Sequence, residues 1–423
     1  MKKLLIFIFI LTASGVFAQK GEKPDWENPL VTEINKEPGR AAFQSYDDME
    51  RILKEEGPQF RKSLNGMWKF HFAKNPAQRP EDFYKESYDV TNWDEIRVPG
   101  NWEVEGFGIP IYVNQPYEFA DPRTPITEMK EGPQPPQIPH DYNPVGSYRQ
   151  SFSIREDWDG REIFIHFGAV KSAFYIWVNG EKVGYSQGSK LPAEFNITDY
   201  AKPGEENTVA LEVYRWSDGS YLECQDFWRI SGIERDVELY SQPQTRIRDF
   251  EVVSVLDDAY RNGELSLYVD VKNHSPENKN IQVAMELYGQ KNDAPICQQK
   301  RTIKLAKMSE ATVSFESTIE DARQWSAEDP QLYNLVIRIQ NEEGEDIEGT
   351  QRKIGFRSVE IKQGQLMVNG VPVTLKGVNL HEHHPETGHV MDEEMWMRDI
   401  ELMKRNNINA VRLAHYPQAD RWY

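Results

Sequence analysis

The sequence predicts a multidomain protein in which two antiparallel β modules precede the first part of a parallel α/β unit. Its 423 residues correspond to about three domains of roughly 150 residues each. Between residues 64 and 358, runs of alternating apolar and polar residues recur, as in strands with one buried face. The pattern then changes to strand, helix and strand within about 40 residues, and such a unit requires a parallel sheet.

The first 18 residues have the three parts of a secretory signal peptide. A basic start at residues 1–3 precedes an apolar run at residues 4–11, and small side chains at Val16 and Ala18 fit cleavage after Ala18. A membrane anchor would need about 20 apolar residues, which this run does not reach. We therefore expect an exported protein, periplasmic or secreted, with no membrane-spanning segment.

The charge balance excludes some classes of partner. The chain has 68 acidic and 49 basic residues, a net charge of −19, and this charge repels nucleic-acid phosphates and anionic lipid. Cys224 and Cys297 are its two cysteines, too few for a disulfide-stapled scaffold or a zinc ribbon. Spacing does not decide whether they pair, and two buried free thiols are the simpler interpretation.

An N-terminal arm at residues 19–63 leads into a β module at residues 64–242. Aromatic side chains alternate with polar ones at residues 68–72, and Asn179-Gly180 between two strand-like runs predicts a hairpin. Strands of this length with turns between them predict a β-sandwich or jelly roll. The proline-rich stretch at residues 114–146 predicts a long irregular loop, and such loops are usually functional.

Residues 243–358 predict a second, smaller β module. Apolar and polar residues alternate cleanly at 264–271 and 332–339, and about a hundred residues suit an immunoglobulin-like sandwich. No group of chemically active side chains stands out, so we interpret this module as a spacer.

The parallel unit is predicted at residues 359–423. A hairpin at Asn369-Gly370 leads into a buried strand at 374–379, and a helix begins after Asp392 with apolar residues at i, i+4 and i+7. A second strand follows at 408–413.

Both predicted parallel strands end in loops that contain histidines. Residues 381–384, His-Glu-His-His, follow the first strand, and His415 follows the second. Because the carboxyl ends of parallel strands share one edge, His381 and His415 should lie together, and with His389 five of the nine histidines would border one pocket. The spacing does not match a His-Glu-x-x-His zinc helix. Neutral imidazoles that bind a polyhydroxyl ligand and purely structural histidines both remain open.

A second group of aromatic and charged residues lies between positions 216 and 236. Aromatic faces beside carboxylates are typical of a carbohydrate-binding surface, but a salt-bridged sheet edge is equally compatible with the pattern. The residues are Trp216, Asp218, Tyr221, Glu223, Asp226, Trp228, Arg229, Arg235 and Asp236.

Several motifs resemble those of family 2 of the glycoside hydrolases. GVNLHEHHP at residues 377–385 and NAVRLAHYP at 409–417 resemble the family as a whole. Four further motifs resemble the β-galactosidase branch of that family: LECQDFWRISGI at 222–233, PGNW at 99–102, PIYVN at 110–114 and DWENP at 25–29. The resemblance implies a β jelly-roll sugar-binding domain, an immunoglobulin-like β-sandwich and the start of a (β/α)8 TIM barrel.

The resemblance also implies roles for individual residues. Arg412 would orient carboxylates beneath the sugar, Glu382 belongs to the same binding motif, and Asp226 would help to hold a sodium ion. Cys224 departs from the aspartate of some relatives and Leu380 from arginine, which puts fine substrate preference in doubt. The implied substrate-binding residues are Asn114, Asp226, His381 and His415.

The implied reaction is hydrolysis of terminal non-reducing β-D-galactose residues with retention, which requires two carboxylates. In the family both are glutamates on later barrel strands. About 65 residues follow Ser358, whereas a barrel takes about 250. We therefore expect the acid/base, the nucleophile and the Mg²⁺ ligands beyond Tyr423, and activity only in the full-length enzyme, which in this family is frequently a homotetramer. β-Glucuronidase or β-mannosidase activity and a non-catalytic carbohydrate-binding protein are the alternatives.

Overall fold

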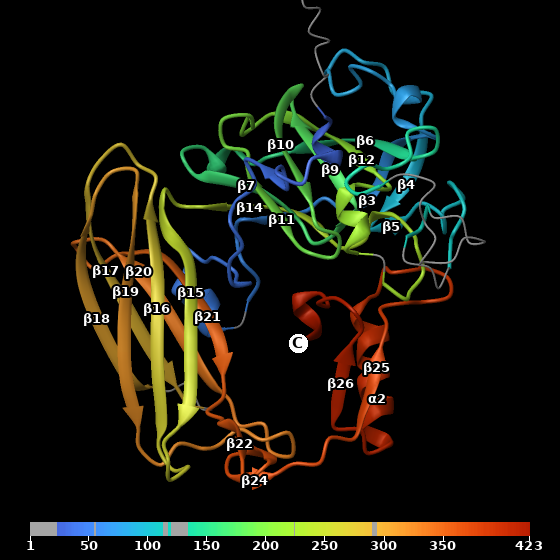
Figure 1. Ribbon diagram of the computed structural model, residues 1–423. Coiled ribbons are helices and arrows are strands. Elements are labelled where there is room, and N and C mark those ends of the chain that lie inside the picture. The colour runs from blue at the N-terminus through green and yellow to red at the C-terminus, as the bar shows by residue number, and fades with distance from the viewer. Residues whose placement is uncertain (1–22, 55, 113–116, 120–133, 224, 290–293) are drawn as a thin grey trace, which may run out of the picture.

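The computed structural model contains two β-sandwiches and a short parallel α/β segment (Figure 1). Among the residues that it describes, no helix is long and apolar enough to cross a bilayer. The described residues are 23–54, 56–112, 117–119, 134–223, 225–289 and 294–423.

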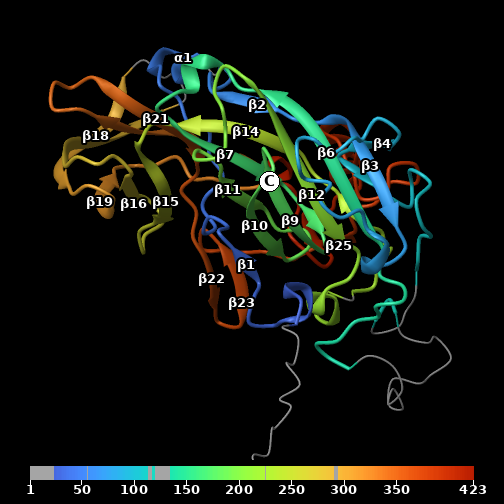
Figure 2. The same ribbon diagram turned by 90° about the horizontal axis from the view of Figure 1, so that it is seen from above.

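The first sandwich is the predicted jelly roll, built from a larger and a smaller antiparallel sheet (Figure 2). The larger sheet has the order β1 (Glu33–Ile34), β10 (Glu181–Gln187), β9 (Ala173–Val178), β12 (Glu206–Tyr214), β6 (Val145–Ser153), β3 (Gly66–Ala73) and β4 (Asp94–Val98). The smaller has the order β11 (Ala193–Asn196), β7 (Glu162–Phe167), β14 (Val237–Gln242) and β2 (Arg61–Ser63). A third short sheet joins β5 (Gly100–Asn101), β13 (Gly232–Ile233) and β8 (Val170–Lys171).

The core of the jelly roll lies between its sheets. Trp68 and Phe70 of β3 are fully buried, as their alternation with polar neighbours predicts. Asn179 and Gly180 take φ values of 52° and 84° and connect β9 to β10, which confirms the predicted hairpin.

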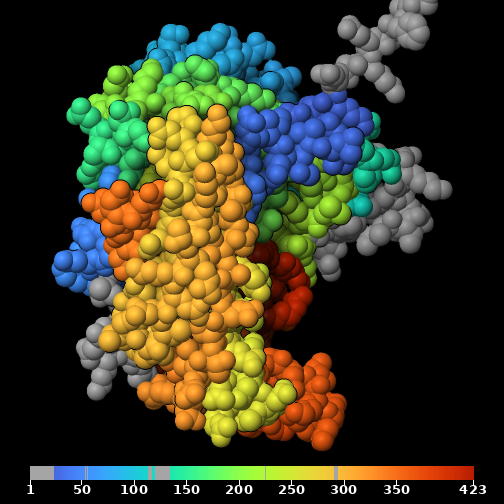
Figure 3. Space-filling view, turned by 90° about the vertical axis from the view of Figure 1, so that its left-hand side faces the viewer, coloured from blue at the N-terminus to red at the C-terminus, as the bar shows by residue number. Residues whose placement is uncertain are grey.

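The second sandwich is immunoglobulin-like. One sheet has the order β15 (Thr245–Leu256), β16 (Gly263–Asn273) and β19 (Ser309–Ile319), and the other β18 (Pro295–Leu305), β17 (Lys279–Tyr288), β20 (Tyr333–Gln340) and β21 (Asp346–Ile354). Leu267, Val283 and Leu335 fill the space between the two sheets. Figure 3 faces this sandwich, whose yellow and orange strands run beside the blue N-terminal arm.

The arm connects the two sandwiches. It contains η1 (Asp25–Glu27) and α1 (Met49–Leu53), and it adds β1 and β2 to the edges of the jelly-roll sheets. Arg40 makes two hydrogen bonds of 3.1 Å to Glu194 of the jelly roll, and Tyr46 exchanges two backbone hydrogen bonds with Gly349 of β21. Further 3-10 turns are η2 (Pro76–Gln78), η4 (Glu156–Trp158), η5 (Asp218–Tyr221) and η6 (Asp420–Trp422).

The last segment is the predicted parallel unit. A small meander, β22 (Val359–Lys362), β23 (Gln365–Val368) and β24 (Val371–Pro372), precedes β25 (Gly377–Leu380), α2 (Glu393–Arg405) and β26 (Ala410–Leu413). β25 pairs with β26 in parallel, from Gly377 opposite Ala410 to Leu380 opposite Leu413. The Asp392 side chain caps α2 by accepting a hydrogen bond from the Met395 backbone N–H, 2.9 Å long.

The prediction of a buried strand at 374–379 is wrong in one respect. The strand forms at Gly377–Leu380, but its residues are exposed or half-buried, and those of β26 are too. The reason is that a parallel sheet is normally covered on both faces, whereas here two strands are joined by one helix.

Candidate functional site

The two histidine loops meet at one edge of the parallel sheet. His381 follows β25, and His415 lies two residues after β26. Their rings form a T-shaped pair, with centroids 5.5 Å apart and an interplanar angle of 76°. Both side chains are exposed. Parallel pairing of β25 with β26 is therefore what brings the two imidazoles together.

Arg412 fixes the orientation of His415. Its Nη1 donates to Asn379 Oδ1 at 3.4 Å, and its Nη2 lies 3.3 Å from His415 Nδ1. Because a guanidinium only donates, Nδ1 must accept, and Nε2–H of His415 is left as a donor for a ligand. Desolvation, the Arg412 charge and His381 lower the pKa of His415, which keeps this imidazole neutral at pH 7.

Asp226 of the jelly roll lies within electrostatic range of His415. Its carboxylate opposes the downward shift of the His415 pKa. The Tyr112 hydroxyl donates to Asp226 Oδ1 at 2.8 Å. An ionised carboxylate accepts about four hydrogen bonds, so Asp226 retains capacity for ligand hydroxyls.

An aromatic group from the jelly roll borders the histidines. The Trp228 indole, 38% exposed, stacks on the His383 ring at 6.1 Å and 14°, and Tyr112 lies 5.5 Å from Trp228. The C–H faces of sugars pack on such rings. Asn114, the fourth predicted substrate-binding residue, lies outside the described residues.

Three members of the aromatic and charged group between positions 216 and 236 are buried, so a carbohydrate-binding surface is wrong for those three, which are Trp216, Asp218 and Arg229. The Trp216 side chain donates to Glu118 Oε2 at 2.6 Å, and Glu118 also binds Lys171 at 3.0 Å. Arg229 is 1% exposed beside the same carboxylate. Sequence alternation does not reveal which side of a loop faces solvent, and this loop turns Asp226 and Trp228 outward.

The expectation that five histidines border one pocket is also wrong. His384 Nδ1 accepts the backbone N–H of Glu386 at 3.2 Å, so this side chain stabilises its own loop. His389 is 1% exposed, with Nδ1 2.8 Å from Lys190 Nζ and 3.1 Å from Glu234 Oε1. Both lie within ten residues of His381, but the loop reverses direction between them.

Glu382 points into the protein rather than toward the histidines. It is 3% exposed, and its Oε2 lies 3.1 Å from Arg235 Nη2 and 3.9 Å from Lys190 Nζ. This carboxylate is therefore committed to a buried ion pair. Sequence reasoning missed Lys190, Glu234 and Tyr112 as neighbours of the site, and Tyr112 alone carried a signal because it lies in the PIYVN motif.

The described residues build no metal centre by themselves. Within those ranges no group of three or more His, Cys, Asp or Glu side chains is placed to hold a metal ion. Asp226 is a single carboxylate, and one of its oxygens accepts a hydrogen bond from Tyr112, so its sodium-binding role stays a prediction.

Cys297 is a half-buried free thiol that donates to Ser317 Oγ at 3.2 Å, and Cys224 lies outside the described residues.

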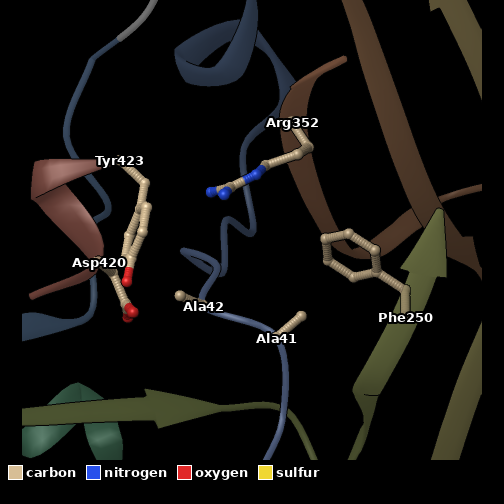
Figure 4. Close-up of a pocket in the computed structure, with 6 residues that line it drawn as sticks. All are labelled: Ala41, Ala42, Phe250, Arg352, Asp420 and Tyr423. Carbon is tan, nitrogen blue, oxygen red and sulfur yellow. The ribbon is translucent and has the colours of Figure 1, made fainter. Parts of the chain in front are cut away.

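A separate cavity of about 240 Å³ lies between the arm, the immunoglobulin-like sandwich and η6 (Figure 4). The described site residues that the sequence predicts do not line this cavity. Its charged groups are one guanidinium and one carboxylate, those of Arg352 and Asp420. The lining residues are Ala41, Ala42, Phe250, Arg352, Asp420 and Tyr423.

Three family models match the chain in succession. They are described as "Glycosyl hydrolases family 2, sugar binding domain" for residues 61–243, "Glycosyl hydrolases family 2" for 245–357 and "Glycosyl hydrolases family 2, TIM barrel domain" for 359–423. The chain belongs to glycosyl hydrolase family 2. Membership confirms the resemblance and the predicted fold class of jelly roll, immunoglobulin-like sandwich and start of a TIM barrel.

Curated relatives of this family 2 chain include proteins named beta-galactosidase. One from Priestia megaterium is 42% identical over 95% of this chain and 38% of its own length. One from Photobacterium profundum is 41% identical over 95% of this chain and 38% of its own length. The chain thus spans less than two fifths of these relatives.

Solved family 2 structures have the same fold. The beta-glucuronidase of Bacteroides uniformis superposes with a TM-score of 0.71 at 22% identity, covering 86% of this chain and 40% of the other. A family 2 member from Bacteroides cellulosilyticus gives a TM-score of 0.69 at 22% identity, covering 86% and 44%. At such identity the likeness concerns the fold alone.

Proposed function

We propose that this chain is the N-terminal part of a β-galactosidase, which hydrolyses terminal non-reducing β-D-galactose residues in β-galactosides with retention. The observation that carries the proposal is that Asp226, from the jelly roll, lies within electrostatic range of His415, whose ring meets that of His381 at the end of the parallel strands. Curated relatives named beta-galactosidase, about 40% identical over nearly the whole chain, support galactose as the sugar.

The three groups suit a ring with several hydroxyls. Neutral His415 donates through Nε2–H because Arg412 occupies its Nδ1. Asp226 accepts from hydroxyls, and a hydrogen bond to an ionised group is worth about 1.5–3 kcal/mol. The exposed indole of Trp228 provides an apolar face at the border of the same site.

Retaining hydrolysis needs two carboxylates about 5–5.5 Å apart, one as acid/base and one as nucleophile. Glu382 is the carboxylate nearest to the histidines in sequence, but it is buried and paired with Arg235. We therefore assign neither role to it. In this proposal both glutamates, and the ligands of a Mg²⁺ ion, come from sequence beyond Tyr423.

The proposal is tested with a panel of aryl β-glycosides. The protein is produced as its gene encodes it, with any sequence that follows Tyr423, and assayed on 4-nitrophenyl β-galactoside, β-glucuronide and β-mannoside. Preference for the galactoside, with β-galactose as the first product seen by NMR, is the expected result. Preference for either other glycoside would replace galactose with that sugar, and galactose binding without turnover would favour a carbohydrate-binding protein.

Variants connect the activity to the described site. Asp226→Asn should lower kcat/KM by about 10- to 150-fold, and His415→Ala by about 3- to 10-fold, from the usual worth of charged and neutral hydrogen bonds. His140→Ala is the control, because His140 lies on the jelly roll beside Glu27 and not at the site. Equal losses in all three variants would contradict the proposed role of the site.

Export, ions and assembly complete the proposal. We propose cleavage after Ala18 and a periplasmic or secreted protein, because residues 1–18 have the signal-peptide pattern. N-terminal sequencing of the exported protein tests this, and a start at Met1 would contradict it.

Na⁺ at Asp226 and a homotetramer are further proposals from family membership, tested by Na⁺-dependent activity and by light scattering.

A further inference from the structure

Each predicted sugar-contacting residue that the structure describes is followed by a buried residue. Phe227 is 7% exposed, Glu382 3% and Tyr416 8%, whereas the residue before each is exposed. The three pairs are Asp226–Phe227, His381–Glu382 and His415–Tyr416. Any displacement of a buried member therefore moves its exposed neighbour.

The three buried side chains gather around Lys190 and His389. Phe227 packs on Tyr416 at 5.5 Å and on His389 at 5.3 Å. The Lys190 ammonium lies 4.7 Å above the Tyr416 ring and 3.9 Å from Glu382. Lys190 thus approaches two of these loops from the jelly roll while also contacting His389.

The charges in this cluster balance. Lys190 pairs with Glu234, and Arg235 pairs with Glu382 at 3.1 Å. Arg235 also donates to the Pro417 carbonyl at 2.7 Å. Desolvation lowers the pKa of Lys190, so burial of its charge is costly, and the two carboxylates offset that cost.

The backbone of Lys190 is itself unusual. This residue lies between β10 and β11 with φ of 70°, a region that side chains other than Gly, Asn and Asp rarely adopt. Its carbonyl accepts a hydrogen bond of 3.1 Å from Arg235 Nη1. The fold thus holds a disfavoured conformation in which the ammonium points at the parallel unit.

We propose that Lys190 is a positioning residue of the sugar site: its ammonium holds Glu234, His389 and Glu382 together, and so fixes Asp226 relative to His381 and His415. The inference rests on the proposed function for its substrate, a β-galactoside. Lys190 itself does not touch the sugar. Two domains supply the site residues, so an anchor that bridges the domains determines how well the site is pre-formed.

A matched control exists at another domain interface. Arg246 of β15 pairs with Glu162 of β7 at 2.6 Å, and His274 binds the other oxygen of Glu162. Arg246 is 2% exposed and Glu162 1%, close to the values for Lys190 and Glu234. This cation, carboxylate and histidine join the jelly roll to the immunoglobulin-like sandwich, away from the site.

The experiment compares Lys190→Met with Arg246→Met in the protein as its gene encodes it. Both variants should lower the melting temperature, because each leaves a buried carboxylate without its cation. Lys190→Met should also raise KM for 4-nitrophenyl β-galactoside about tenfold and speed hydrogen exchange of residues 381–390, since a misplaced site loses binding. Arg246→Met should leave both quantities within twofold of the wild type.

The outcomes separate the inference from the proposed function. Wild-type KM and wild-type exchange in Lys190→Met, or equal changes in Arg246→Met, would overturn the positioning role. If Lys190→Met does not fold, Glu382→Gln takes its place, because it removes one charge of the cluster while keeping the size of the side chain. A raised KM and faster hydrogen exchange of residues 381–390 in Glu382→Gln would support the positioning role, and wild-type values of both would overturn it. If the wild type does not act on galactosides, the proposed function fails, and the exchange of residues 381–390 still decides the role of Lys190.

Discussion

Gly388 offers a sharp test of how the parallel unit docks on the jelly roll. Its φ is 67°, and a Cβ at this position would lie 2.6 Å from Asn101 Oδ1 and 2.7 Å from Ile230 Cδ1. Asn101 cannot swing away freely, because its side chain accepts the His389 backbone N–H at 2.8 Å and donates to Glu234 at 3.0 Å. Gly388→Ala should therefore push the loop off the jelly roll.

The expected cost has two parts. A left-handed conformation costs an L-residue about 1–2 kcal/mol relative to glycine. Overpacking in a well-packed interface adds about 1–3 kcal/mol. The total is about 2–5 kcal/mol for Gly388→Ala. Gly344 is the matched control, because its φ is 86° and no described atom lies within 4 Å of the place where a methyl group would stand, so Gly344→Ala should cost only the first part.

Native-state hydrogen exchange is the suitable assay, because a chain of several domains has no single free energy of unfolding. Gly388→Ala should speed exchange in residues 381–390 by about thirtyfold or more, the equivalent of about 2 kcal/mol. Gly344→Ala should leave that segment unchanged. Equal exchange of residues 381–390 in Gly388→Ala and the wild type would refute this docking geometry.

Two further predictions concern single side chains. Burial, and then Lys190, lower the pKa of His389 to about 4, so stability that is complete above about pH 6.5 should fall by about 3 kcal/mol as the pH drops to about 4. His389→Gln cannot take up this proton and should flatten that part of the stability profile, read as the local opening free energy of residues 381–390 from native-state hydrogen exchange at several pH values. An unchanged slope of that free energy with pH would contradict the assignment. Tyr112→Phe removes the hydroxyl bonded to Asp226 and should raise KM for a β-galactoside about 3- to 10-fold. Tyr268→Phe, on β16 of the other sandwich, is the control that should not.

The strands and their connections were largely predictable because their signals are local. The alternation around Trp68 and Phe70 reports one buried face, and Asn179-Gly180 reports a turn with two positive φ values. The meeting of His381 with His415 was predictable too, since parallel pairing of two strands fixes the edge at which both end.

The burial of charged loop residues was not predictable from the same signals. Glu382 and His389 stand in one polar loop with His381, and nothing in their spacing separates an exposed imidazole from a buried one. The separation depends on Lys190 and Glu234, which approach from a domain about 150 to 200 residues earlier in the chain.

Residues close together in the chain are enough to predict the order of the three parts, the hairpins, the capped helix and the shared edge of His381 and His415. The tertiary structure alone decided which polar side chains face a ligand and which are buried between domains. Burial of a charge becomes favourable only when an opposite charge lies beside it, and the partners of Glu382 come from another domain.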